Sequence, residues 1–560
     1  MRKIGLYDTT LRDGTQGEGF QLSVADKLSV ASLLDDLGIH WIEGGWPGSN
    51  PRDKEFFHKA AGLNLKNSRL TAFGSTRRVG LSCDQDPVLR ALLEAGTPVV
   101  TIFGKSWRFQ ATHALNIDPA VNLEMIEESV HWLKSRVDEV YFDAEHFFDG
   151  YKDDSTYALA AVAAAVRGGA DGVVLCDTNG GSLPGEIESI TEKVAETTSC
   201  LIGIHAHNDG ELAVANSLAA VTAGAGMVQG TINGYGERCG NANLISIIPG
   251  LEAKLGMKCL PEGRLTTLTE VSRQVDELSN NRPRANQPYV GRSAFAHKGG
   301  VHVSAVMKDS KTYEHLEPET VGNRRRVLIS DLSGKSNILH KAREYGLDLD
   351  ASDPATPAIV DMIKDMENKG YQFEGADASF KLLLDKARGR RPVYFRLHEL
   401  KVESQSRGDG GGHGITASEA RASIRLQVGD VVAETRAVGN GPVHAIDLAL
   451  RKLIDKFYPA LKAVRLLDYK VRVVSSGNST GSKIRVLVNS TDGKHSWATI
   501  GVSENIIDAS WFALVDALEF KLVKDGVSNW EEEDAAVPVR PAFGQPLPSG
   551  TPAAGQEMRL

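Results

Sequence analysis

The first half of the chain alternates between short apolar runs and segments whose apolar residues recur at helical spacing. Continuous apolar runs are typical of strands in a parallel sheet that is covered on both faces, and segments such as 23–39 and 119–137 are typical of amphipathic helices. The eight runs are 3–11, 40–45, 69–74, 98–104, 139–145, 172–178, 201–208 and 227–234. Eight such units in about 250 residues predict a closed (β/α)₈ TIM barrel. An open, doubly wound sheet is the alternative.

Polar or glycine residues end most of these apolar runs. The run ends are Thr10–Asp13, Glu43–Gly45, Asp143–Glu145, Asp177–Asn179, His205–Asp209 and Asn233–Gly234. Active sites of TIM barrels lie at the C-terminal ends of the strands. The polar residues are therefore concentrated where a barrel would carry out chemistry.

The rest of the chain predicts three further regions after a barrel of residues 1–261. Residues 262–391 are mainly helical in pattern and form an expected connecting region. Residues 392–527 contain a duplication, because 422–454 resembles 482–520 and Ala449-Leu450 matches Ala513-Leu514. Each copy has alternating strands followed by one helix, and two such ββα-type units in tandem predict a compact α+β domain with pseudo-twofold symmetry. Residues 528–560 are rich in Pro, Gly and Ala, and we expect them to be disordered.

Composition narrows the class of protein. The 560 residues are 41% hydrophobic and 24% charged with a net charge of −9, so no overall basic field favours nucleic acid or an anionic membrane. Five scattered cysteines without a CxxC pair argue against a disulfide framework. The N-terminus lacks a signal-peptide core, and no apolar run approaches the roughly 20 residues that span a bilayer. We expect a cytoplasmic protein.

Two histidines at the end of the seventh run form the core of a candidate metal site. His205 and His207 are two apart on a predicted strand, so both imidazoles point to one face. Asp13 ends the first run, which a closed barrel separates from the seventh by a single strand, and Asn241 lies in the loop 234–244 over the same mouth. Nitrogen and oxygen donors leave Mn, Mg, Zn and Co open. The alternative is that both histidines only hydrogen-bond to neighbouring strands.

A metal with two free positions would suit chelation of a 2-oxo acid through its keto and carboxylate oxygens. Arg12 is then placed to stabilise a developing alkoxide, or to form a salt bridge within the barrel. Thr178 is placed to donate to a substrate carboxylate, or to cap a helix. Glu145 is placed to act as a general acid or base or to hold the second substrate, or it pairs with Arg12.

Several motifs resemble one enzyme family. "DTTLRDGTQ" (8–16), "HAHND" (205–209), "GYGERCGNANL" (234–244) and "SAFAHKGGVHVSAV" (293–306) are similar to the metal-dependent Claisen-type synthases that condense acetyl-CoA with a 2-oxo acid, namely isopropylmalate, homocitrate and citramalate synthases. The resemblance implies metal ligands at Asp13, His205, His207 and Asn241, and substrate-orienting or catalytic roles for Arg12, Glu145 and Thr178. It adds His302 and Tyr313 from the connecting region, which in such enzymes reaches over the barrel of a partner subunit and implies a homodimer.

Two stretches resemble the citramalate-forming members of that family: 35–53 and 501–522. They imply pyruvate as the oxo acid, citramalate and CoA as products, a place in isoleucine biosynthesis, and isoleucine as the inhibitor bound by the C-terminal domain. Deprotonation of the acetyl-CoA methyl group needs a desolvated base, for which Glu145 is the first choice and His302 the second. The alternatives are a sister synthase for a larger oxo acid, a lyase of the same barrel type, and a non-catalytic amino-acid sensor.

Overall fold

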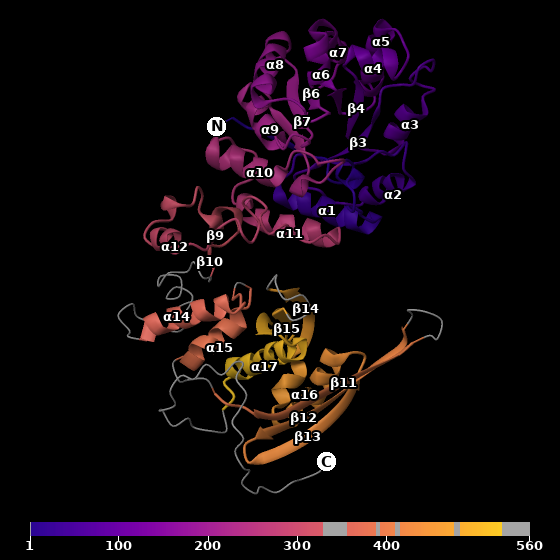
Figure 1. The fold of residues 1–560 in the computed structure, drawn as a ribbon. Helices are drawn as coiled ribbons and strands as arrows, with labels where there is room; N and C mark the ends of the chain where they lie inside the picture. Colours follow the sequence, from indigo (N-terminus) through magenta and orange to yellow (C-terminus); the bar gives the residue numbers. More distant parts are fainter. Residues whose placement is uncertain are drawn as a thin grey trace. The chain divides into compact units, whose positions relative to one another are not determined.

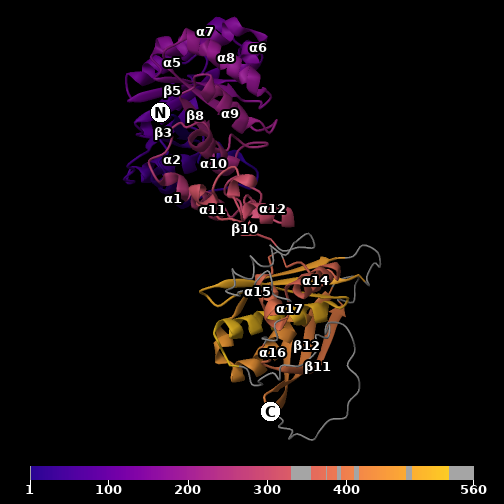
Figure 2. The ribbon, with the colours of Figure 1, turned by 90° about the vertical axis from the view of Figure 1, so that its left-hand side faces the viewer.

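The eight apolar runs fold as the parallel strands of a closed barrel (Figures 1 and 2). In this computed structural model the strands are β1 (Gly5–Asp8), β2 (Trp41–Gly45), β3 (Arg69–Ser75), β4 (Val99–Lys105), β5 (Glu139–Glu145), β6 (Gly172–Asp177), β7 (Leu201–Ala206) and β8 (Met227–Gly230). β1 pairs with both β2 and β8, with Tyr7 opposite Trp41 on one side and Gln229 on the other. This closure confirms the TIM barrel and excludes the open sheet.

The structure describes residues 2–328, 355–373, 375–387, 392–408, 415–474 and 482–528. The chain forms two units: one holds residues up to 296 together with 314–326, and the other holds 297–313 and the chain from 327 onward. Most of the tail expected to be disordered, residues 529–560, lies outside the described residues, as do 329–354 and 388–391 of the expected connecting region.

Helices surround the barrel in the order that its pattern predicts. They are α1 (Val24–Leu37), α2 (Pro51–Ala60), α3 (Pro87–Glu94), α4 (Arg108–His113), α5 (Pro119–Lys134), α6 (Phe147–Asp153), α7 (Ser155–Gly168), α8 (Pro184–Thr197), α9 (Ala213–Thr222), α10 (Leu244–Pro249) and α11 (Leu268–Leu278). Shorter helical turns are η1 (Gly14–Gln16), η2 (Ile232–Gly234), η3 (Gly250–Lys254), η4 (Arg264–Thr267) and η6 (Pro318–Val321).

Three of these helices start with the same pair of residues, a polar N-cap followed by proline. Asn50, Asp86 and Asp118 each accept a backbone hydrogen bond from the first turn and each precede a proline. A polar N-cap satisfies amide groups that the helix itself leaves unpaired, and a proline at the first helical position has its φ angle already set. These local signals fix where the helices start and therefore how long the loops over the barrel mouth are.

The barrel interior is apolar at one level and polar at the next. Alternate strand residues face inward. The inward residues nearer the N-terminal ends of the strands form a buried, mainly apolar cluster of Tyr7, Val99, Tyr141, Val174, Cys176 and Met227. The inward positions that follow along the strands are polar and buried, among them Glu43, Thr101, Asp143 and Gln229. Residues of the opposite parity, such as Leu6, Ile42 and Val228, join the core beneath the helices. The strand period therefore delivers a polar layer at the C-terminal end of the barrel.

The second unit contains the predicted duplicated α+β domain. It has α12 (Gly300–Val306), η5 (Ser310–Thr312), α14 (Ala355–Asn368), α15 (Asp377–Ala387), β11 (Arg396–Gly408), β12 (Ile415–Val428), β13 (Val431–Gly439), α16 (Pro442–Phe457), η7 (Pro459–Ala463), β14 (Arg465–Val473), β15 (Ile484–Thr491), β16 (Ser496–Ser503) and α17 (Ile506–Lys524). The short strands β9 (Ala296–His297) and β10 (Arg326–Val327) lie at the changes of unit.

The two copies repeat down to a single hydrogen bond. β11–β12–β13 and β14–β15–β16 are antiparallel sheets, followed by α16 and α17 respectively. The hydroxyl of Thr435 donates to the carbonyl of Ala449, and the hydroxyl of Thr499 donates to the carbonyl of Ala513, both at 2.7 Å. Both copies contribute to one core, which includes Leu450 and Leu514. Each copy is a βββα unit and not the predicted ββα-type unit, because its first strand, β11 or β14, lies before the duplicated stretch.

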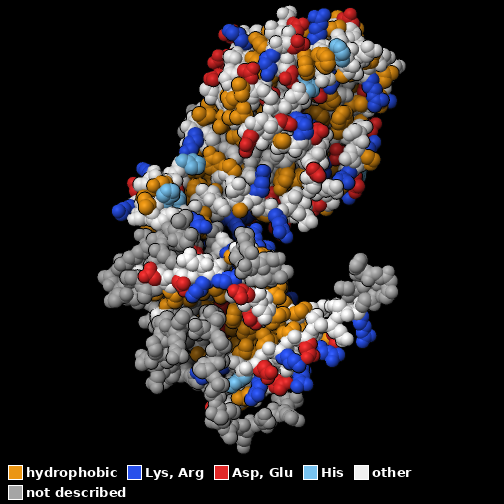
Figure 3. Space-filling model, in the orientation of Figure 1, with side chains coloured by type: hydrophobic (Ala, Val, Ile, Leu, Met, Phe, Trp, Pro, Cys, Tyr) orange, Lys and Arg blue, Asp and Glu red, His pale blue; other side chains and the backbone are white. Residues whose placement is uncertain are grey.

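The surface of the barrel unit carries both charges. Figure 3 shows acidic and basic side chains interspersed over the face in view. None of the helices in the described ranges is both long enough and apolar enough to cross a bilayer.

Candidate metal centre

Asp13, His205 and His207 meet at the mouth of the barrel. Their ligand atoms all lie within 4.8 Å of one another. Asp13 Oδ2 is 3.3 Å from His205 Nε2, and the two Nε2 atoms are 3.3 Å apart. The three residues are 2%, 6% and 7% exposed. The structure therefore brings Asp13 next to two histidines that lie almost 200 positions further along the chain.

Local hydrogen bonds explain how Asp13 reaches the histidines. The loop after β1 is tied to the end of β8, because Thr9 N donates to Gly230 O and Ile232 N donates to the hydroxyl of Thr10. Asp8 accepts from the backbone and the hydroxyl of Thr10, both at 2.8 Å. The loop therefore leans across β8 toward β7, where His205 and His207 lie on one face.

Asn241 lies against the Asp13 carboxylate. Its Nδ2 donates to Asp13 Oδ2 at 2.8 Å, while its Oδ1 is buried and has no partner among the described residues. His207 Nδ1 is also buried without a partner there. Buried polar atoms are nearly always satisfied, so the orphaned Oδ1 of Asn241 beside the Asp13 carboxylate favours a bound cation. The residues present fit a divalent metal.

The loop that carries Asn241 depends on glycine. Gly240 has φ of +91°, and a Cβ there would collide with the carbonyl oxygen of Gly234. Any other residue would move the loop and with it the orphaned Oδ1.

Gln229 and Asp143 support His205 from within the barrel. His205 Nδ1 lies 2.8 Å from Gln229 Oε1, and Gln229 Nε2 donates to Asp143 Oδ1 at 3.1 Å. Because Oε1 can only accept, His205 carries its proton on Nδ1 and presents the lone pair of Nε2 to the site. Burial raises the pKa of Asp143 to about 7, and the neighbouring Glu43 carboxylate adds to this.

The electrostatics keep the three groups in different states. Burial opposes a charge on Asp13, but Arg12 and His205 hold its pKa well below the usual range. Burial, together with His205, lowers the pKa of His207 to about 3, which keeps this imidazole neutral. Burial disfavours a charge on His205 as well, yet Asp13 outweighs it and raises the His205 pKa. A metal ion bound at Nε2 of His205 would compete with the second proton that this raised pKa favours.

Arg12 forms a salt bridge within the barrel. Its Nε donates to Glu43 Oε1 at 2.6 Å, and its Nη1 is 3.5 Å from Asp13 Oδ2. The guanidinium carbon lies 3.8 Å from the centre of the Phe73 ring. Burial disfavours this charge, but Glu43 and Asp13 raise the Arg12 pKa, so the cation is permanent. It is held rigidly beside the candidate metal position.

The alternative pairing of Arg12 with Glu145 is wrong. Glu145 pairs with Lys105 instead, which stands opposite it in the parallel register of β4 and β5. The reason is the strand order: β1 neighbours β2, so Glu43 reaches Arg12, whereas β5 lies across the barrel.

Thr178 does not cap a helix. The next helix, α8, begins at Pro184 with Leu183 as its N-cap, so that alternative is also wrong. The Thr178 hydroxyl oxygen accepts from His146 N at 2.8 Å. Since this bond uses a lone pair, the hydroxyl hydrogen is left to donate, and the residue is only half-buried.

His302 and Tyr313 belong to the second unit. Their rings stack with centroids 4.1 Å apart at an interplanar angle of 24°. His302 is exposed, and Tyr313 is 48% exposed. The structure brings these two residues together, and neither belongs to the unit that contains the barrel.

Four residues at the site were given no individual role from the sequence, although two of them stand at predicted run ends: Glu43, Lys105, Asp143 and Gln229. Each occupies an inward position of a strand, at the parity of His205 on β7. That parity was the available signal, because a polar residue at an inward position of an apolar run has to find a buried partner.

A cavity of about 380 Å³ lies beside the loop after β8. Arg273, Arg284 and Arg292 line it together with Asp276. Arg284 donates to the carbonyl of Asn233. Asn233 lies between the end of β8 and the loop that carries Asn241. The cavity therefore adjoins the barrel mouth and carries an excess of positive charge.

Comparisons with known proteins divide the chain into three matches. A family model described as HMGL-like matches residues 3–275, one described as homocitrate synthase post-HMGL domain-like matches 289–371, and one described as LeuA allosteric (dimerisation) domain matches 374–522.

Curated relatives match over nearly the whole chain. The chain is 54% identical over 524 residues to an (R)-citramalate synthase of Aquifex aeolicus, covering 93% of this chain and 98% of that protein. It is 52% identical to an (R)-citramalate synthase of Geobacter sulfurreducens, covering 94% and 98%. It is 31% identical to a 2-isopropylmalate synthase of Shouchella clausii, covering 92% and 96%.

Proposed function

Because this chain belongs to the family of isopropylmalate, homocitrate and citramalate synthases, metal-dependent enzymes that use an acyl-CoA in a condensation, we propose that it forms (R)-citramalate and CoA from acetyl-CoA, pyruvate and water. The observation that carries the proposal is the convergence of Asp13, His205 and His207 with the orphaned Oδ1 of Asn241 at the barrel mouth. Identities of 42–54% to five relatives named (R)-citramalate synthase favour pyruvate over a larger oxo acid.

In this proposal Asp13, His205, His207 and Asn241 hold a divalent cation, with Mn, Mg, Zn and Co as candidates. When bound, the ion supplies Lewis acidity that polarises a keto oxygen. Arg12 adds a fixed positive charge beside that position and stabilises the alkoxide that forms when the enolate attacks the keto carbon. Glu43 positions the guanidinium by accepting from its Nε.

The remaining polar groups orient substrate and move protons. Thr178 donates its hydroxyl hydrogen to the pyruvate carboxylate. Glu145 removes a proton from the acetyl-CoA methyl group, and its pairing with Lys105 sets its orientation at the end of β5. His302 and Tyr313 activate the water that hydrolyses citramalyl-CoA, with the connecting region of one subunit placed over the barrel of another.

The arginine-lined cavity is suited to binding a second substrate that carries phosphate groups. Acetyl-CoA carries several phosphate charges, and arginine is well suited to phosphate because its guanidinium donates two parallel hydrogen bonds. In this proposal Arg273, Arg284 and Arg292 hold the phosphorylated end of acetyl-CoA, and the thioester extends toward the barrel mouth.

The division of the chain into domains is part of the same proposal and rests on its similarity to the family. We divide it into a catalytic barrel (1–261), a connecting region (262–391) and a regulatory domain (392–527). The match to an allosteric dimerisation domain supports a homodimer, with isoleucine as a feedback inhibitor of isoleucine biosynthesis.

Product identification tests the function. The purified chain is incubated with acetyl-CoA and pyruvate, 2-oxoisovalerate or 2-oxoglutarate, with and without each divalent cation, and released CoA and organic acids are measured. Pyruvate should give citramalate with kcat/KM at least tenfold above the larger oxo acids, and chelation should abolish turnover. Equal turnover of a larger oxo acid would assign the chain to a sister synthase. Metal-independent binding of isoleucine without any turnover would make it a sensor.

A further inference from the structure

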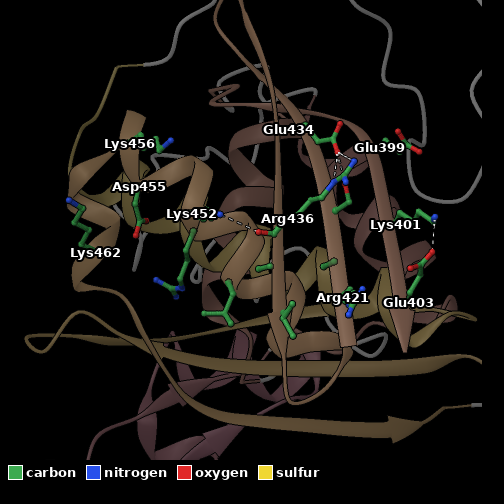
Figure 4. A pocket seen from close by; sticks show the side chains of 16 residues that line it. Glu399, Lys401, Glu403, Arg421, Glu434, Arg436, Lys452, Asp455, Lys456 and Lys462 are labelled. Carbon is green, nitrogen blue, oxygen red and sulfur yellow. Dashed lines mark hydrogen bonds and ion pairs between the residues drawn. The ribbon is translucent and has the colours of Figure 1, made fainter. Parts of the chain in front are cut away.

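A broad groove runs across one copy of the duplicated domain. It has a volume of about 1160 Å³ and lies along the sheet β11–β12–β13 and helix α16 (Figure 4). Strand residues Lys401, Arg421 and Arg436 line it, as do Lys452 and Lys456 of α16 and Lys462 of η7. The groove is therefore rich in cations, although the chain as a whole is acidic.

The cations at the two sides of the groove differ in their pairing. On the strands, Lys401 pairs with Glu403 at 2.7 Å, and Arg436 pairs with Glu434 at 2.9 Å (Figure 4). Arg421 pairs with Glu419 at 2.8 Å. These charges are already compensated, so they add little to an anion-binding potential.

The lysines at the helix side form no such pairs. Lys452, Lys456 and Lys462 are exposed, and none makes an ion pair with a carboxylate of the described residues. Lys452 and Lys456 are four residues apart on α16, so their side chains share a face. The lining also contains the carboxylate of Asp455, one oxygen of which is buried without a hydrogen-bond partner among those residues. Lys462 and Arg451 act electrostatically on the Asp455 carboxylate, so this end of the groove sets one carboxylate against three lysines and is net positive.

The described chain ends close to these lysines. The hydroxyl of Tyr394 donates to the carbonyl of Val527 at 3.0 Å, and the hydroxyl of Tyr458 donates to the carbonyl of Tyr394 at 2.8 Å. Tyr458 directly follows α16, two residues after Lys456 and four before Lys462. The C-terminal segment therefore leaves the domain at the same end of α16 as the unpaired lysines.

The sequence just beyond this exit is acidic. Glu531, Glu532, Glu533 and Asp534 are four consecutive carboxylates, and Glu557 is the only other acidic residue between them and the end of the chain. Six extended residues from Ser528 to Asp534 span at most about 20 Å, so the acidic run stays within about that distance of the point where the chain leaves the domain. Trp530 precedes the acidic run, and the groove also exposes the apolar side chains of Val438 and Leu448.

We propose that the acidic segment 531–534 of this chain docks in cis against Lys452, Lys456 and Lys462 in this groove. Single exposed ion pairs contribute little, but four carboxylates tethered a few residues away are present at high effective concentration. The groove is thus a binding site for the chain's own C-terminal segment. This role goes beyond the proposed reaction and does not depend on it.

Proteolysis of the full-length chain tests the docking. A glutamate-specific protease cleaves after Glu531–Glu533 only when the segment is free, so docking slows cleavage there. The variant Lys452→Glu/Lys456→Glu/Lys462→Glu should be cleaved about fivefold faster or more, and 0.5 M salt should speed cleavage of the parent chain but not of the variant. Lys494→Glu, an exposed lysine in the turn between β15 and β16, is the matched control and should cleave at the parent rate. Equal cleavage of the parent and the triple variant overturns the proposal.

A second measurement identifies the occupant and guards against a folding defect of the triple variant. A 1:1 mixture of ¹⁴N- and ¹⁵N-labelled parent chains, subunit-exchanged before reaction, is treated with a carbodiimide, which joins a lysine amine to a carboxylate with loss of water. Peptides joining 531–534 to Lys452, Lys456 or Lys462 should carry one isotope only. Mixed-isotope peptides would show docking onto a second copy and overturn docking in cis. Coupling to Lys494 as often as to these three lysines would show an unbound segment and equally overturn it.

Discussion

The Nε2 atoms of His205 and His207 lie 3.3 Å apart in a buried position, and the Asp13 carboxylate is at the same distance from the first of them. His205 donates its Nδ1 hydrogen to Gln229 Oε1, which leaves Nε2 with a lone pair, and the low pKa of His207 keeps that ring neutral. Two imidazole lone pairs that converge on a carboxylate form a pocket for a cation, and the charge of a cation offsets the cost of burying them.

Removing one imidazole should abolish metal binding. His207→Ala leaves Asp13 and His205 without their third ligand, so affinity for Mn²⁺ or Co²⁺ should fall by at least about a hundredfold, and kcat by about a thousandfold or more. Isothermal titration and steady-state rates measure both. His131→Ala, which removes an exposed histidine on α5, should change neither. Unchanged metal affinity in His207→Ala would remove this residue from the site.

Gln229 should act on the metal without touching it. Gln229→Leu keeps the approximate side-chain volume but removes the acceptor that fixes the Nδ1 proton of His205. Metal affinity should fall about 10- to 100-fold, and saturating metal should restore most of kcat. Gln274→Leu, on α11, is the control. A loss of kcat that saturating metal does not restore would show that Gln229 has another role.

Arg12 should contribute mainly to the transition state. Arg12→Lys keeps one positive charge but loses the planar donor that is held between Glu43 and the Phe73 ring. We expect kcat to fall by about 10²- to 10³-fold with a small change in the KM for acetyl-CoA. Arg136→Lys, at an exposed arginine beside Trp132, serves as the matched control. An effect confined to KM would place Arg12 in substrate binding alone.

The arginine-lined cavity should determine affinity for acetyl-CoA. The double variant Arg273→Gln/Arg292→Gln removes two positive charges and leaves in place Arg284, which supports Asn233. The KM for acetyl-CoA should rise about tenfold while the KM for pyruvate stays constant. Arg264→Gln removes an exposed charge outside the cavity and is the control. If both KM values rise together, the cavity does not bind acetyl-CoA selectively.

Asp8 should make stability depend on pH. Burial raises its pKa to about 7, against about 3.9 for an unfolded chain, so the fold favours its neutral form. Its contribution to stability is fully present below about pH 4 and is lost as pH rises to about 7. Between these values the free energy of unfolding of the parent should fall relative to Asp8→Asn by up to about 4 kcal/mol. Urea unfolding at both pH values measures this.

The control for that titration is Asp36→Asn, at an exposed position on α1. Its unfolding free energy should follow the parent at every pH. A difference between the parent and Asp8→Asn that stays constant from pH 4 to pH 7.5 would show that Asp8 ionises normally in the fold.

The sequence predicts the barrel and the histidine pair because both follow from local periodicity. The apolar runs alternate with helical segments, and a strand period of two aligns His205 with His207 whatever the rest of the fold does. Their meeting with Asp13 could be anticipated only after eight strands had been assigned to a closed barrel, in which β8 alone separates β1 from β7.

Partners across the barrel interior could not be predicted in the same way. The pairing of Arg12 with Glu43 and of Glu145 with Lys105 depends on strand register, and a shift by one residue would turn either carboxylate outward. Gln229 and Asp143 lie 86 positions apart and meet only because both point inward at the same level. Such contacts are properties of the closed sheet and have no local signature in the sequence.

Crystallographic location of Mn²⁺ in the presence of pyruvate tests the central claim most directly. The account predicts an anomalous peak within coordination distance of Asp13, His205 and His207, with pyruvate bound to the same ion and within reach of Arg12. A Mn²⁺ ion at another position in a crystal of the active protein, with these three side chains bound only to one another, would contradict it.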